Sequence, residues 1–349
     1  MEKLLELVEM RHHFDGLSLI ERMEECRVEG VSIALVENFE VTETFVHGCE
    51  KRANFRQINR ETRFQTASIS KPVFAAAVLR LVQKGVLDLD ADIAQYLTDY
   101  ELPTFDGKKH KITLRQLLSH EAGLNLSGFS GYVGRQYIPT IEEILKGEHP
   151  ANHEKLKLKK LPNTAFEYSG GGYTLAQKIV MDVTGQDFCE LMDEIILKKC
   201  KMKNSSFRRA VLDDGFACGY NAHDLEIEGE YCIMPELAAA GLWASPTDIA
   251  NFGIGIMKSL NGKGRIMKKT SAEQMVKKAH DFSEYGVGFE IGESKMGSTF
   301  GHSGSNVGYT SNMIFEPVSG CGIVVMVNSS IGWHIPFDVT NAFKEMFGF

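Results

Sequence analysis

Segments with the pattern of β-strands lie at both ends of the chain, and helical patterns fill the region between them. Near the start, β-branched and partly alternating runs at residues 31–36 and 41–46 flank a short turn, which predicts a hairpin. Further extended runs cover residues 64–66, 286–291, 299–302, 310–315 and 322–327. This distribution predicts one sheet assembled from both ends of the chain, because its strands must bury an apolar face against other elements.

Segments with helical periodicity lie in the middle of the chain and near its two ends. It covers residues 17–26, 71–84, 113–119, 141–145, 173–183, 188–197, 247–259 and 337–347. We therefore expect an α/β plus all-α fold, with an antiparallel β-sheet flanked by N- and C-terminal helices and a large helical insertion. The expected sheet domain comprises residues 1–66 and 280–349, and the mainly helical domain residues 67–279. A cleft between the two is expected to hold the active site.

The segment 71–84 is apolar on nearly every side and stops at Gly85. A helix without a polar face is a buried helix. Pro72 fits only in the first turn of such a helix, which places the beginning near residues 68–71.

Charge and composition exclude several classes of protein. Of the 349 residues, 38 are basic and 46 acidic, for a net charge of −8, which argues against a nucleic-acid partner. No apolar run reaches the roughly 18 residues of a membrane span, and no membrane association is expected. The expected partner is a small-molecule ester, amide or short peptide, and the sequence is silent on oligomeric state.

The seven cysteines are odd in number and widely spaced, and no Cys-x-x-Cys occurs. This pattern predicts reduced thiols, and not disulfides or a zinc site.

The acidic, amphipathic opening of the chain lacks the features of a secretory signal, so a cytoplasmic location is expected, although the sequence leaves open whether a signal was removed. His149 and His153 stand four residues apart, but Pro150 argues against a shared helix face for a metal.

Ser68 and Lys71 stand three residues apart where the buried helix begins. That spacing puts both side chains on one face, within reach of each other. A serine hydroxyl becomes a good nucleophile when a neighbouring base takes its proton, and a desolvated lysine can act as that base. The spacing alone is weak evidence, since about 1.6 such pairs arise by chance in a chain of this composition. An ordinary surface Ser and Lys is the alternative.

Tyr168 precedes three consecutive glycines, Gly170 to Gly172, which allow close approach of backbone to a ligand or another chain. A phenol near a cation has a lowered pKa, and Lys71 is the cation we expect to lower it. A turn tyrosine packed on the following helix is the alternative.

A third candidate follows a predicted strand, where His302, Gly304 and Ser305 stand close together. Gly304 permits an unusual backbone angle, the N–H of Ser305 can face a substrate oxygen, and His302 is a potential proton carrier or hydrogen-bond donor. The alternative is a strand-end histidine with a solvated ring.

In this order, the three elements resemble the motifs of the serine β-lactamase and penicillin-binding-protein superfamily. The family carries Ser-x-x-Lys, then Tyr-x-Asn, then Lys-Thr-Gly or His-x-Gly, and the corresponding segments here are 68–71, 168–170 and 302–304. Segments 85–90, 112–120, 239–243 and 301–306 are also similar, so the resemblance runs from about Phe14 to the C-terminal helix. The class C β-lactamase-like branch, which includes esterases and D-aminopeptidases, is the most similar.

The resemblance implies a β-lactamase/transpeptidase-like fold and an acyl-enzyme mechanism without metal or organic cofactor. Ser68 would attack an acyl carbon, while Lys71 and Tyr168 share the transfer of its proton to the leaving group. The backbone N–H groups of Ser68 and Ser305 would form the oxyanion hole. Gly304 and Asn306 would lie at the substrate-binding edge, and His302 would orient the substrate. Trp243, Tyr132 and Asn306 are candidates for lining the cleft, with core or loop packing as the alternative.

Two departures from the family pattern bear on the substrate. Gly170 stands where the family has Asn, and His302 stands where true β-lactamases have Lys. Both changes disfavour efficient β-lactam hydrolysis, and a serine hydrolase of small esters, most plausibly a carboxylesterase, is the leading hypothesis. A D-amino-acid peptidase or a weak β-lactamase or penicillin-binding protein is the alternative. A catalytically inactive ligand-binding or assembly scaffold is the alternative of another class, and transfer of the acyl group to an alcohol or amine also stays open.

Overall fold

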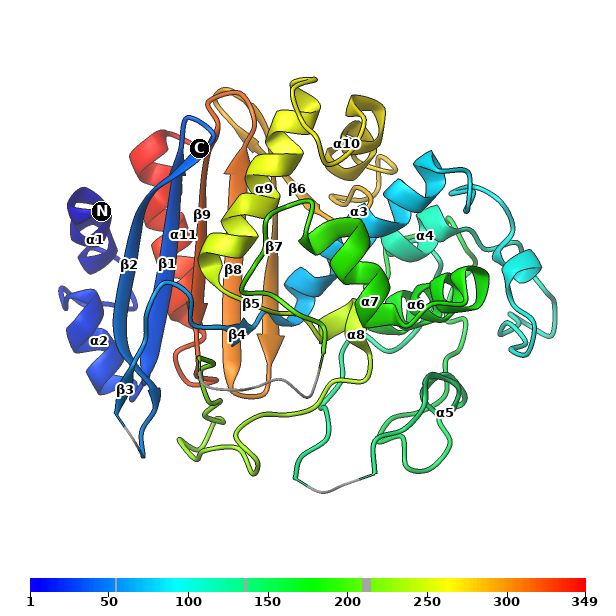
Figure 1. Ribbon diagram of the computed structural model, residues 1–349, viewed down its shortest axis with the longest axis horizontal. Helices are drawn as coiled ribbons and strands as arrows, with labels where there is room; N and C mark the ends of the chain where they lie inside the picture. The colour runs from blue at the N-terminus through cyan, green and yellow to red at the C-terminus, as the bar shows by residue number, and fades with distance from the viewer. Residues whose placement is uncertain (54, 135–136, 209–214) are drawn as a thin grey trace.

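The computed structural model describes residues 1–53, 55–134, 137–208 and 215–349. A seven-stranded antiparallel sheet has the strand order β3-β2-β1-β9-β8-β7-β6 (Figure 1). Its strands are β1 (Gly30–Glu37), β2 (Glu40–Lys51), β3 (Arg56–Gln57), β6 (Glu290–Ser294), β7 (Gly297–Asn306), β8 (Tyr309–Glu316) and β9 (Cys321–Val327). The two ends of the chain meet where β1 pairs with β9, with Val31 opposite Val327. The prediction of one antiparallel sheet built from both ends is confirmed.

Successive side chains of β1 enter two different apolar cores, because side chains alternate across a strand. Val31, Ile33 and Leu35 belong to the core beneath α11 (His334–Phe347), together with α1 (Glu2–Glu9) and α2 (Leu19–Glu25). Ala34 and Val36 belong to the larger core on the other face. There α9 (Pro246–Leu260) covers the sheet, on the opposite side from α11 (Figure 1).

The rest of the larger core is built from helices of the middle of the chain. They are α3 (Ser70–Gln83), α4 (Leu114–Leu118), α5 (Ile141–Lys146), α6 (Gly170–Thr184), α7 (Phe188–Met192), a π-helical turn (Asp193–Leu197), α8 (Leu237–Ala240) and α10 (Lys269–Val276), with short 3-10 turns at Ala67–Ile69 and Ile93–Tyr96. None of the helices in the described ranges is long and apolar enough to cross a membrane.

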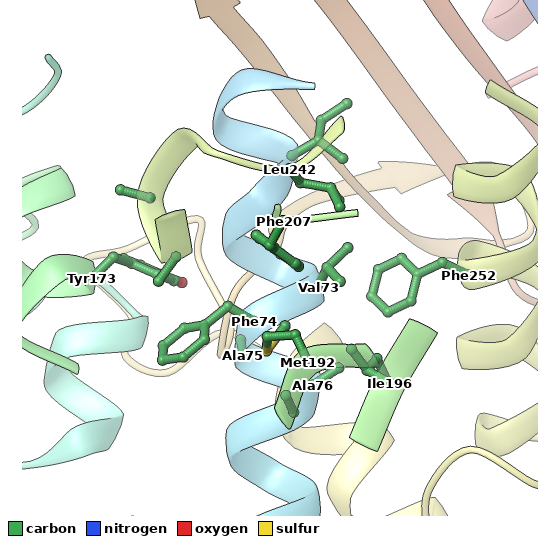
Figure 2. Packing of buried hydrophobic residues seen from close by; sticks show 14 of the residues in the cluster. Val73, Phe74, Ala75, Ala76, Tyr173, Met192, Ile196, Phe207, Leu242 and Phe252 are labelled. Carbon is green, nitrogen blue, oxygen red and sulfur yellow. The ribbon is translucent and has the colours of Figure 1, made fainter. Parts of the chain in front are cut away.

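The helix α3 is buried without interruption from Ser70 to Leu79. Figure 2 shows its residues 73–76 between side chains of the surrounding helices, among them Tyr173, Met192 and Phe252. Each fully buried Val, Leu or Phe stabilises the fold by roughly 1.5–3 kcal/mol. The expected buried helix is therefore present, and Pro72 lies in its first turn as predicted.

Several expected boundaries differ from the structure. The strand expected at 286–291 begins only at Glu290, because Gly288 has φ +99° and lies against α3, where a Cβ would come within 2.6 Å of Ala75 Cβ. The extended piece at 64–66 lies outside the large sheet: β4 (Phe64–Gln65) pairs with β5 (Trp243–Ala244). The helical pattern at 188–197 divides into α7 and the π-helical turn, and α11 begins three residues before the expected 337.

The division into domains at residues 66 and 280 stays a prediction. One continuous apolar core contains both sheet residues such as Val324 and helix residues such as Phe74. The helix α9 packs on the sheet although it falls within the expected helical insertion.

Candidate active site

Ser68 lies in the 3-10 turn Ala67–Ile69, directly ahead of α3, and its side chain is partly exposed. Ala67 has φ +49°, a left-handed conformation that costs of order 1 kcal/mol for a non-glycine residue. The surrounding strands hold this turn in place: Ser311 Oγ donates to Thr66 O (2.9 Å). A Cβ at Gly304 would lie 2.3 Å from the same Thr66 oxygen, so only glycine permits this approach of β7.

Lys71 is 2% exposed and meets the Ser68 hydroxyl. Its Nζ lies 2.9 Å from Ser68 Oγ and 2.8 Å from the carbonyl oxygen of Ala239. Among the described residues no acidic group offsets the burial of this amine. Burial lowers the pKa of Lys71 to about 7, because a low-dielectric environment disfavours the ammonium. A large neutral fraction at pH 7 makes the amine a competent base for the hydroxyl beside it.

Tyr168 joins the same pair from the loop ahead of α6. Its ring centroid lies 5.0 Å from Lys71 Nζ. Burial raises the pKa of Tyr168 above its usual range, and a hydrogen bond with Ser68 only partly opposes this shift. The expectation that Lys71 lowers the pKa of Tyr168 is therefore wrong: desolvation of the phenol outweighs any effect of the amine, which is itself only partly charged at pH 7. The phenol of Tyr168 is therefore protonated at neutral pH.

His302 is buried in β7 and faces Tyr285, whose phenol oxygen lies 3.2 Å from His302 Nε2. Its Nδ1 lies 2.5 Å from the carbonyl oxygen of Ser303, which accepts a hydrogen bond from this nitrogen. Burial, together with the nearby Lys71, lowers the pKa of His302 to about 3. The ring is thus neutral, and its centroid lies 6.3 Å from that of Tyr168. This position fits an orienting role better than proton transfer.

The end of β7 presents one open edge beside Ser68. Its pairing with β6 stops at Gly301 opposite Glu290, whereas its pairing with β8 continues to Asn306. Ser305 is exposed on this segment. Asn306 is instead buried, with Nδ2 donating to Gln65 Oε1 (2.7 Å) and to Ala240 O (3.1 Å). Its amide joins three segments, and these contacts favour a structural role over the predicted contact with substrate.

The glycine that stands in place of the family's Asn is covered by an aromatic ring. A Cβ at Gly170 would lie 2.8 Å from Phe129 Cε2, so Phe129 occupies the space into which a side chain at 170 would extend. Phe129 is partly exposed and packs edge-on against His153 (ring centroids 5.2 Å apart). The neighbouring Ser169 caps α6, with Oγ accepting the N–H of Gly172 (2.9 Å).

Two further candidates from the sequence lie in the core. Trp243 is 4% exposed and packs against Tyr309 and Tyr231. Tyr132 is 3% exposed, and its hydroxyl accepts the N–H of Asn152 (3.1 Å). Both contacts match the core-packing alternative.

Reasoning from the sequence missed two residues around the phenol. His120 is buried, stacks on Tyr168 (ring centroids 4.2 Å apart) and accepts the N–H of Ser169 at Nδ1 (3.0 Å). Burial lowers the pKa of His120 far below its ordinary value, so the ring is neutral. Tyr285 lies 2.9 Å from Glu290 Oε1 as well as beside His302. His120 ends the segment 112–120, whose similarity to the family could have pointed to this residue. The sequence around Tyr285 contains no comparable family segment.

The antiparallel sheet with a buried helix behind a partly exposed serine defines the class of fold, that of the serine hydrolases related to β-lactamases. A family model described as Beta-lactamase matches residues 18–334, and the chain belongs to this family. The resemblance expected from the three motifs is thereby confirmed.

Individual relatives agree with this assignment. Esterase EstB of Burkholderia gladioli is 28% identical over 192 residues, which cover 53% of this chain and 48% of the esterase, so the chain spans about half of that relative's length. The octameric penicillin-binding protein homologue from Pyrococcus abyssi has a TM-score of 0.78 and 25% identity, covering 94% of this chain and 76% of that chain. D-amino acid amidase from Ochrobactrum anthropi SV3 has a TM-score of 0.76 at 22% identity, covers 99% of both chains and shows a shared fold.

Proposed function

We propose that the protein is a carboxylesterase that cleaves small esters through a covalent acyl-Ser68 intermediate. The observation that carries this proposal is the contact between Lys71 Nζ and Ser68 Oγ (2.9 Å), in which burial leaves a substantial fraction of the amine neutral at pH 7. A neutral amine at hydrogen-bond distance from a serine hydroxyl has the geometry and the proton affinity of a general base.

The opposite pKa shifts of the two side chains beside Ser68 support an assignment of roles. Lys71 takes the proton of Ser68 as Oγ bonds to the acyl carbon, and the protonated phenol of Tyr168 donates its proton to the departing alkoxide. The ammonium of Lys71 then returns a proton to the phenolate. In the second half of the reaction, water attacks the acyl carbon and its proton passes to Lys71. The bond between the acyl carbon and Ser68 Oγ then breaks, and Oγ regains a proton.

The N–H of Ser68 supports a site for the oxyanion. Among the described residues, no backbone carbonyl outside its own turn accepts this N–H. Together with the N–H of Ser305 on the open edge of β7, it would stabilise the negative oxygen of the tetrahedral intermediate. Each donor of this kind is worth about 3–4 kcal/mol.

Two features support esters over β-lactams and peptides. His302 is neutral at physiological pH and supplies no fixed charge for a substrate carboxylate. Phe129 covers Gly170, where an amide side chain would otherwise bind polar groups of the substrate.

The seven cysteines are free thiols, five of them buried, which supports the expected cytoplasmic location.

Labelling with a fluorophosphonate, followed by intact-mass measurement, tests the proposal. We expect one covalent adduct on the wild-type protein and none on Ser68→Ala, with circular dichroism confirming that the variant folds. Absence of an adduct on the wild-type protein would contradict the proposal and favour the inactive scaffold. A turnover panel of p-nitrophenyl esters, D-aminoacyl amides and nitrocefin then ranks the substrates, and faster turnover of the amides would favour the D-amino-acid peptidase.

A further inference from the structure

A cluster of three potential metal ligands lies far from Ser68. It comprises His13, His334 and Asp338, whose ligand atoms all lie within 4.8 Å of one another, and it is the one such group found among the described residues. His13 Nδ1 lies 2.8 Å and His334 Nδ1 lies 3.3 Å from the same oxygen, Asp338 Oδ2. Side chains separated by 325 positions in the chain thus converge on one point. We refer to these three residues as the His13 cluster.

Local structure explains why the three side chains meet. His334 and Asp338 are four residues apart at the start of α11 and therefore lie on the same face of the helix. His13 is brought to them by the turn that follows α1, in which the neighbouring Phe14 is fully buried in the core beneath α11. The cluster joins the N-terminal segment to the C-terminal helix, on the face of the sheet opposite α9 (Figure 1).

The donor set matches the requirements of a zinc ion. Two imidazole nitrogens and a carboxylate oxygen are common ligands of Zn²⁺, with bonds of about 2.0–2.2 Å. In a tetrahedral site such ligands stand about 3.3 Å apart. His334 Nδ1 lies at this distance from Asp338 Oδ2 (3.3 Å), whereas His13 Nδ1 lies closer (2.8 Å). Small rotations of the partly exposed His13 would bring its nitrogen from contact with Asp338 to this spacing. The exposed side of His13 leaves a fourth position open to water.

The second nitrogen of His334 has its own partner, which is a further property of metal-binding histidines. Its Nε2 lies 3.6 Å from the sulfur of Cys26. A partner at the outer nitrogen fixes the orientation of the ring and leaves the other nitrogen for the metal. Asp338 is 7% exposed, and its Oδ2 accepts hydrogen bonds from Nδ1 of both His13 and His334.

We propose that His13, His334 and Asp338 bind Zn²⁺ and thereby fasten the N-terminal segment to α11. The bound ion replaces the direct contacts of the two imidazoles with Asp338 by three coordinate bonds. Because the folded chain holds the three ligands together and the unfolded chain does not, binding stabilises the folded state. The site takes no part in the chemistry at Ser68, so its presence or absence leaves the proposed esterase mechanism unaffected.

Calorimetric titration of ZnCl₂ into the metal-free, full-length protein tests the site. We expect one Zn²⁺ per chain, with an affinity at least about tenfold weaker in Asp338→Asn and in His13→Ala. His149→Ala removes an exposed histidine outside the cluster and serves as the matched control, with unchanged affinity expected. Thermal unfolding with Zn²⁺ in large excess should show a melting temperature about 3 °C higher for the wild-type protein, but not for His13→Ala.

Two outcomes would overturn the proposal. One is absence of Zn²⁺ binding by the wild-type protein, which would leave the cluster as two imidazoles hydrogen-bonded to one carboxylate. The other is equal Zn²⁺ affinity in the wild-type protein and both cluster variants, which would place binding elsewhere. The side chain of His13 is 48% exposed, so its replacement tests the site even if Asp338→Asn fails to fold. Visible absorption of bound Co²⁺, lost in His13→Ala, provides an independent check of the ligands.

Discussion

The two sides of the Ser68 hydroxyl are built in different ways. On the side of α3, Lys71 is buried, held by Ala239 and fixed in a helix that is enclosed by the core. On the side of α6, a glycine and a partly exposed aromatic ring, Gly170 and Phe129, stand where the family has a polar amide. We infer that the difference separates two tasks: the α3 side sets the reactivity of the hydroxyl, and the α6 side selects the acyl groups that fit beside it.

Replacement of Lys71 tests the α3 side and should have the largest effect. Lys71→Met retains the volume but removes the base, so we expect kcat/KM for p-nitrophenyl esters to fall by roughly 10²–10⁴-fold. Steady-state kinetics measure this change. A decrease of less than about threefold would show that another group accepts the proton of Ser68.

Tyr168→Phe tests the phenol, which lies between the two sides. It keeps the ring stacked on His120 but removes the proton that we assign to the leaving group. For alkyl esters we expect kcat to fall by about 10²-fold or more. Circular dichroism should show that the variant folds like the wild-type protein. If p-nitrophenyl esters, whose leaving group needs little protonation, are affected as strongly as alkyl esters, then donation to the leaving group is not the role of Tyr168.

Lys71→Met also makes a prediction about stability. The folded state holds Lys71 with a pKa of about 7, below that of the unfolded chain, so the unfolded state binds more protons between about pH 7 and pH 10.5. Burial of this lysine therefore costs most stability below pH 7, and the cost declines as pH rises. We expect the variant to be more stable than the wild-type protein by on the order of 2 kcal/mol at pH 6. Denaturant unfolding at pH 6 and pH 10 measures the difference, and an equal or larger gain at pH 10 would contradict a buried, neutral amine.

Changes on the α6 side should alter selectivity and spare reactivity. Phe129→Ala removes the ring over Gly170, and we expect the turnover of longer relative to shorter apolar acyl groups to change by about tenfold. The double variant Phe129→Ala/Gly170→Asn gives the amide room and should raise turnover of D-aminoacyl amides relative to esters. Labelling of Ser68 by a fluorophosphonate is the control and should proceed at the wild-type rate. An unchanged acyl preference in Phe129→Ala would show that the ring does not contact substrate.

The sequence predicted the sheet and the buried helix well because periodicity and burial repeat over many residues. The same applies to Ser68 and Lys71, since three positions within one helical turn determine their proximity. The positive φ of Ala67, the ring of Phe129 over Gly170 and the stacking of His120 on Tyr168 arise from contacts between distant segments, which no local pattern encodes. The sign of the pKa shift of Tyr168 was wrong for the same reason: it depends on desolvation by neighbours that the sequence does not place.

The pH dependence of kcat/KM for a p-nitrophenyl ester tests the role of Lys71 most directly. Because the neutral amine is the active form, kcat/KM should rise with pH and reach a plateau, with an apparent pKa near 7. In Lys71→Met the residual rate should lack this inflection. A wild-type profile that is flat through neutral pH, or that rises only above roughly pH 9, would contradict the assignment of Lys71 as the base.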